Sequence, residues 1–110
     1  MIAALAMLAA CGGSPGDSAV DPCAEAPVVT WETFGKGFLR ENCQGCHAST
    51  VTDRAGAPVD VTFDDEAQAL AWRERILARA ATDVPTMPPQ GGTTDDDRWR
   101  LAIWLTCGGR

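Results

Sequence analysis

Several residue types that define common functional classes are scarce in this chain of 110 residues. His47 is the single histidine, so no site that needs two histidines can form within one chain. Nine Lys and Arg against 15 Asp and Glu give a net charge of −6. Phosphate binding requires a basic face, so we expect no nucleic-acid partner. The sequence shows no internal repeat, no run of strands and no Gly-rich phosphate loop, and its length suits one domain.

The first ten residues form an uncharged apolar run that is too short to cross a bilayer as a helix. Leu8, Ala9, Ala10 and Cys11 resemble the lipobox of bacterial lipoproteins, whose cysteine receives the lipid. We therefore expect a lipoprotein signal peptide over residues 1–10 and lipid attachment at Cys11. The alternative is a stray cysteine after an apolar N-terminus, since no Lys or Arg precedes Cys11.

Residues 11–29 would then be the lipidated cysteine and a flexible tether, because this stretch is rich in Gly, Ser and Pro. The interpretation places the protein on the periplasmic side of a bacterial membrane, held by its lipid. Gly12 rather than an aspartate follows Cys11, which favours the outer membrane.

The remaining residues, 30–110, read as one helical domain. Thr30 can cap a helix from Trp31 to about Asn42, and a second helix is expected from Asp64 or Asp65 to about Ala81. Thr94, followed by three aspartates, is a start signal for a last helix that runs through about Thr106. Residues 48–62 are expected to be mostly loop, with a short extended piece where Val59, Val61 and Phe63 alternate with polar residues.

The motif with the strongest chemical meaning is Cys43-Gln44-Gly45-Cys46-His47, the C-x-x-C-H signature of covalent haem attachment. Two cysteines at this spacing can reach both vinyl groups of one porphyrin, and the next histidine can bind the iron. Two rivals remain open. A thioredoxin-like C-x-x-C would begin a helix in a βαβ pattern, and a zinc site would need four ligands, which Cys23 and Cys107 complete poorly.

From Trp31 to Gly108 the chain resembles the class I cytochrome c family. Gly35 and Leu39 stand eight and four residues before Cys43, and Leu101-x-x-Trp104-Leu105 is similar to the family's C-terminal contact motif. The resemblance implies an all-α class, a small cytochrome c fold with about three main helices and loops around one covalently attached haem c. It also implies that Gly35 lets Trp104 pack closely where the first and last helices cross.

Elimination and resemblance together give the iron ligands. His47 would bind on one side, and Met87, the only methionine after the expected signal peptide, would bind on the other. Met87-Pro88-Pro89 is similar to the family's sixth-ligand loop, whereas core packing is the usual role of a lone methionine. The resemblance also implies that the Pro58 carbonyl accepts a hydrogen bond from His47 Nδ1, unless Pro58 is an ordinary loop proline.

Cys23 and Cys107 are left over, and they bracket the expected domain. An exported compartment permits a disulfide between them, with two free thiols as the alternative.

These features predict an electron carrier and not an enzyme. We expect a monomer whose redox protein partners have a basic docking patch that suits its negative charge. The alternative is a haem-binding sensor, or the haem subunit of a larger oxidoreductase, in which Met87 is displaceable. A structural lipoprotein that never acquires haem is a third reading.

Overall fold

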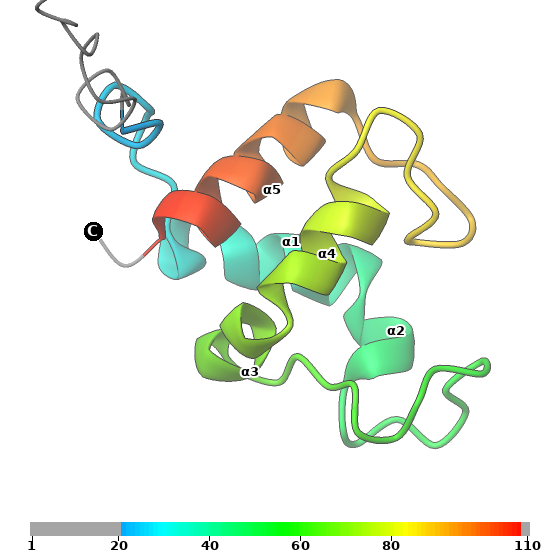
Figure 1. Cartoon of the computed structure of the whole chain (residues 1–110). Helices are drawn as coiled ribbons and strands as arrows, with labels where there is room; N and C mark the ends of the chain where they lie inside the picture. Colours follow the sequence, from blue (N-terminus) through cyan, green and yellow to red (C-terminus); the bar gives the residue numbers. More distant parts are fainter. Residues whose placement is uncertain (1–20, 109–110) are drawn as a thin grey trace, which may run out of the picture.

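The part of the chain that the structure describes, residues 21–108 in a computed structural model, contains helices and loops and no strand. In chain order the helical elements are the π-helix η2 (Trp31–Gly35), α1 (Lys36–Asn42), α2 (Gln44–His47), α3 (Glu66–Ala71), α4 (Arg73–Ala80) and α5 (Asp95–Cys107) (Figure 1). The all-α class is therefore confirmed. The expected signal peptide, Cys11 and most of the expected tether lie outside the described residues.

The first predicted helix is confirmed as η2 followed directly by α1, from Trp31 to Asn42. It begins with a reciprocal cap. Thr33 N–H donates to Thr30 Oγ1 over 3.1 Å, and Thr30 N–H donates to Thr33 Oγ1 over 3.2 Å. These bonds satisfy amide groups that would otherwise have no partner in the first turn.

The second predicted helix is two helices, because the backbone turns out of helical geometry at Trp72 (φ −100°, ψ 13°) between α3 and α4. The start at Asp65 is confirmed, since its carboxylate accepts from Gln68 N–H over 2.8 Å. The extended piece expected over Val59, Val61 and Phe63 is wrong at its start, because Val59 lies in a turn, and no strand forms over residues 61–63. Turn bonds from Ala57 N–H to the Arg54 carbonyl and from Val61 N–H to the Pro58 carbonyl fold this backbone back on itself.

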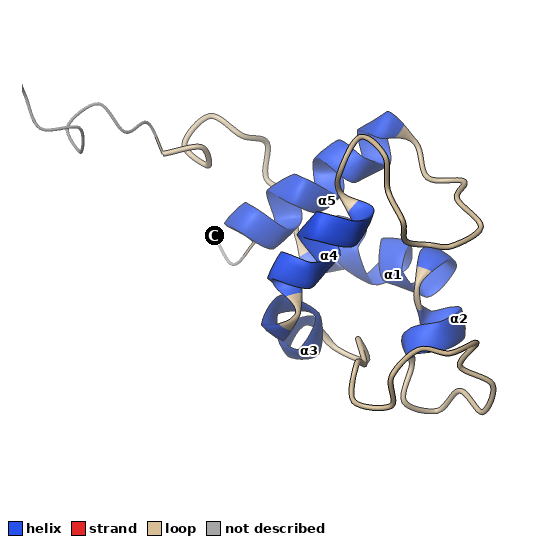
Figure 2. Ribbon diagram, turned by 45° about the vertical axis from the view of Figure 1, so that its right-hand side comes forward, coloured by secondary structure: helices blue, strands red, loops and turns tan. Residues whose placement is uncertain are grey.

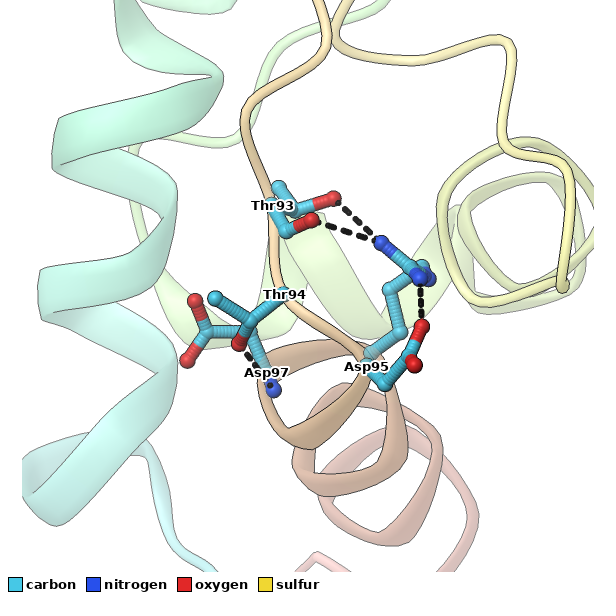
Figure 3. Close-up of polar contacts among 5 residues, drawn as sticks. Thr93, Thr94, Asp95 and Asp97 are labelled. Carbon is cyan, nitrogen blue, oxygen red and sulfur yellow. Dashed lines mark hydrogen bonds and ion pairs between the residues drawn. The ribbon is translucent and has the colours of Figure 1, made fainter.

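The last predicted helix is confirmed as α5, and its acidic start is a cap. Figure 3 shows the Thr94 hydroxyl directed at the backbone nitrogen of Asp97, which donates to it over 3.1 Å. The Asp95 carboxylate pairs with the Arg98 guanidinium, which also donates to the Thr93 carbonyl over 2.7 Å. Carboxylates in this first turn also interact favourably with the helix dipole.

The core forms where α5 crosses η2 and lies beside α4 (Figure 2). Its largest fully buried side chains are Leu39, Leu101, Trp104 and Leu105. A Cβ atom built on Gly35 would lie 2.8 Å from Cε2 of Trp104, so the expected close approach at this crossing is confirmed. Trp31 adds a second ring, with its centroid 5.7 Å from that of Trp104.

A disulfide joins Cys23 to Cys107, the pairing expected by elimination, with the two Cα atoms 5.5 Å apart. It attaches the segment that precedes η2 to the end of α5. Within residues 21–108, the helices are all too short or too polar to traverse a membrane.

Candidate haem-binding site

The C-x-x-C-H motif lies on α2, a single helical turn that leaves the end of α1. Cys43 N–H donates to the Leu39 carbonyl over 2.8 Å, so α1 fixes where the motif begins. Cys46 and His47 both donate their N–H groups to the Cys43 carbonyl, over 3.1 Å and 3.0 Å. Residues three apart in a helix share a face. Cys43 and Cys46 are both free, partly buried thiols one turn apart.

The His47 ring is held in one orientation by two contacts. Its Nδ1 lies 3.0 Å from the Val61 carbonyl oxygen, and its face stacks on Phe63 with ring centroids 4.6 Å apart. The backbone contributes a bond of 3.3 Å from Phe63 N–H to the His47 carbonyl. The Val61 carbonyl can only accept, so its hydrogen bond with the His47 ring requires the proton to be on Nδ1. The lone pair is then on Nε2, the atom left for an iron.

The acceptor for His47 is Val61 and not Pro58, which corrects the role that the family resemblance implied for Pro58. The Pro58 carbonyl accepts instead from Val61 N–H over 3.1 Å and from Arg54 Nη2 over 2.9 Å. The physical reason is the turn that starts at Pro58. It directs the proline carbonyl into the loop and presents the carbonyl three residues later to the ring.

Gln44, inside the motif, helps to place Phe63. Its side-chain amide donates to the Phe63 carbonyl, so Phe63 is bonded at both backbone groups to α2 residues. Further along, Ser49 N–H donates to an Asp64 carboxylate oxygen over 2.8 Å. Hydrogen bonds from Ser49, with a smaller contribution from Arg54, lower the pKa of Asp64 below its ordinary value. The chain after α2 is thus bonded to the chain before α3 at two places.

Arg54 is a residue of the site that sequence reasoning missed. Its guanidinium donates to four backbone carbonyls of the loop between α2 and α3, those of Ala48, Ala57, Pro58 and Val61. Among these is the carbonyl that accepts from His47. The only sequence signal was an arginine inside a Gly- and Pro-containing loop, which does not reveal backbone partners.

Met87 lies in the loop between α4 and α5, and its backbone position is fixed by the end of α4. Met87 N–H and Thr86 N–H both donate to the Arg79 carbonyl, over 3.0 Å and 2.8 Å. The Met87 side chain is partly buried and packs against the core. Figure 1 and Figure 2 both show this loop and α2 along the same side of the molecule.

The state of the thiols bears on the rival interpretations of the motif. Burial, followed by the nearby Cys46, raises the pKa of Cys43 from 9.0 to about 12. A redox C-x-x-C site needs the opposite, a thiol with a lowered pKa that reacts as the thiolate. Among residues 21–108, no three His, Cys, Asp or Glu side chains gather into a metal site, and the disulfide occupies two of the cysteines. Both observations favour the haem interpretation over the redox and zinc interpretations.

The residues present fit a covalently attached haem. Two free thiols stand one turn apart, the histidine that follows them has its Nδ1 engaged and its Nε2 left over, and no other pair of thiols competes. Partly buried apolar side chains of Phe34, Val61 and Met87 pack against the core and offer the kind of surface that a flat, apolar porphyrin needs.

Comparison with known proteins gives one finding. The family model described as "Cytochrome C oxidase, cbb3-type, subunit III" matches residues 33–105, about two-thirds of the chain. The matched range contains Cys43, Cys46, His47 and Met87, and it leaves out both cysteines of the disulfide. No curated protein and no solved structure gives a significant match.

Proposed function

Because the chain belongs to this family of cytochrome c domains, we propose that it is a monohaem carrier of single electrons between redox proteins. Haem c supplies a reversible one-electron Fe(III)/Fe(II) couple, so each cycle takes one electron from a donor protein and gives one to an acceptor. The observation that carries the proposal is His47, whose Nδ1 is bonded to the Val61 carbonyl beside two free thiols.

Each residue of the motif has a separate task. The thiols of Cys43 and Cys46 would each add across one vinyl group, forming a C–S bond while the thiol hydrogen goes to the other vinyl carbon. No oxidant is needed. His47 would bind the iron through Nε2, and its bond to Val61 prevents the ring from rotating.

Met87 is proposed as the sixth ligand. Within residues 21–108 no other methionine and no other histidine is present, and the loop that carries Met87 is bonded to the end of α4. A thioether opposite histidine raises the reduction potential and closes the position at which small molecules would otherwise react.

Covalent attachment is the first test of the function. Acid–acetone extraction should leave the haem on the wild-type protein, and the reduced protein should give the spectrum of a low-spin c-type cytochrome. A variant with Cys43→Ser and Cys46→Ser should lose its haem in the same extraction. A wild-type chain that retains no haem, when purified from a host that matures c-type cytochromes, would reject the carrier function.

The ligand assignment predicts a specific change on Met87→Ala. The ferrous variant should bind carbon monoxide with an apparent affinity at least about tenfold higher, or about 1.4 kcal/mol, because the position opposite His47 is no longer filled by a side chain. Optical titration measures this. Val84→Ala in the same loop, where the valine is 84 % exposed, is the matched control and should behave as wild type. Equal binding by wild type and Met87→Ala would show that Met87 is not the ligand.

A second candidate, the haem subunit of a larger oxidoreductase, is favoured by the description of the matched family. The two functions differ in assembly. A carrier would separate from other haem proteins on mild detergent extraction. A subunit would instead stay with a complex that has oxidoreductase activity. A sensor would instead show ready displacement of Met87 by a gas in the wild-type protein.

For the location we propose an exported protein whose lipid on Cys11 holds it at a bacterial membrane, facing the periplasm. Support comes from the residues before Cys11 and from the disulfide, which persists in oxidising compartments. A mass spectrum of the mature protein checks this, since it should begin at an acylated Cys11. The net charge of −6 supports partners with a basic docking patch.

A further inference from the structure

We propose that Arg54 is a positioning residue that raises the reduction potential by sharing the Val61 carbonyl with His47. The inference rests on the proposed function, because it requires a haem bound through His47. It concerns a residue in the loop that follows the motif, whose hydrogen bonds within the described part of the chain all go to backbone carbonyls.

The geometry begins with the Val61 carbonyl oxygen. It lies 3.0 Å from His47 Nδ1 and 2.9 Å from Arg54 Nη2, so two donors use one acceptor. Arg54 Nη1 donates to the Ala48 carbonyl over 2.8 Å, at the residue directly after His47. The guanidinium therefore bonds to the chain both next to the histidine and at the group that orients its ring.

The charge of Arg54 faces neutral groups. All four of its acceptors are backbone carbonyls, and within residues 21–108 no carboxylate lies within 4.0 Å to form an ion pair with it. Asp64 is the carboxylate that senses it, as a minor cause of a lowered pKa. A positive charge beside His47, the histidine that would bind the iron, favours the iron state with one less positive charge, which is the reduced state.

The sharing of the Val61 carbonyl by two donors also raises the reduction potential. A strong hydrogen bond from Nδ1–H makes a metal-bound histidine more basic and a better electron donor to the metal. When Arg54 also donates to the Val61 oxygen, less of its electron density is available to His47. The ring then donates less to the iron, which again favours the reduced state.

A merely structural role for Arg54 predicts something different. Its bonds also close the loop between Ala48 and Val61, so removing them would loosen the loop. The His47 Nδ1–H bond would then weaken and its proton would exchange faster with water. In our proposal the released carbonyl becomes a stronger acceptor, and this exchange stays the same or slows.

The test compares Arg54→Gln, Arg54→Lys and the control Arg73→Gln in the haem-loaded protein. Arg73 also donates to a backbone carbonyl, that of Leu70 over 3.0 Å, but on α4 and not in this loop. We expect Arg54→Gln to lower the constant for one-electron reduction by up to about tenfold, or 59 mV. Arg54→Lys, which keeps the charge, should recover part of the loss, and Arg73→Gln should leave the potential unchanged.

Proton NMR of the ferrous protein gives the second measurement, the exchange rate of His47 Nδ1–H. An unchanged potential in Arg54→Gln would overturn the proposal, and so would faster exchange combined with no recovery in Arg54→Lys. Failure of the proposed function is a separate outcome, because it would appear in the wild-type protein as absent covalent haem or as a spectrum without His47 ligation.

Discussion

Replacing Cys23 and Cys107 together with alanine is expected to lower the free energy of unfolding by about 4–5 kcal/mol. The two cysteines are 84 residues apart in the sequence, so their bond excludes many conformations of the unfolded chain. A loss this large is close to the whole stability of many small domains. Denaturant titration of the haem-loaded protein, followed by circular dichroism, measures it.

The same titration of the wild-type protein under reducing conditions provides the control. Reduced wild type and the double variant should unfold at the same denaturant concentration, because both lack only the covalent link. Val28 lies five residues after Cys23 and its side chain is exposed, so Val28→Ala should have little effect on the free energy of unfolding. A loss below about 1 kcal/mol in the double variant would contradict the stabilising role given to the bond.

The second large effect is expected at the crossing of η2 and α5. Gly35→Ala would place a methyl group 2.8 Å from Trp104, whose side chain is fully buried and has no room to withdraw. Overpacking of this kind lowers the free energy of unfolding by about 1–3 kcal/mol, even though alanine favours a helix. Thermal or denaturant unfolding of the haem-loaded protein checks the loss.

Gly37 gives a matched control two residues away. A Cβ atom there would have no heavy atom within 4 Å. Gly37→Ala should therefore raise the free energy of unfolding by up to about 1 kcal/mol, because it only removes the flexibility of a helical glycine. Similar effects of the two substitutions would mean that the approach of Gly35 to Trp104 does not limit packing.

The sequence was sufficient where a residue type has a local meaning. Thr30 and Thr94 predicted helix starts because a cap needs an oxygen at that position, and both accept the expected bond. The start expected at Asp64 or Asp65 is found at Asp65, whose carboxylate also accepts from the first turn. The spacing of Gly35 before Cys43 led to the contact with Trp104 through a family resemblance.

Prediction failed where backbone carbonyls decide the structure. The choice between Pro58 and Val61 as the acceptor for His47 depends on a turn, and any residue supplies the same carbonyl oxygen. Arg54 was missed for the same reason, since all its acceptors are backbone groups. The break at Trp72 is also silent in the sequence, because no Gly or Pro marks it.

The disulfide has a mechanical consequence. Cys23 precedes η2 and Cys107 ends α5. Figures 1 and 2 show the segment before η2 next to the end of α5, on the side of the molecule opposite α2. A force that pulls on the chain before Cys23 passes through the sulfur bridge into α5 and not through the segment that leads to α2. The lipid anchor proposed for Cys11 would thus pull on a point that is joined to α5, on the side of the molecule opposite α2.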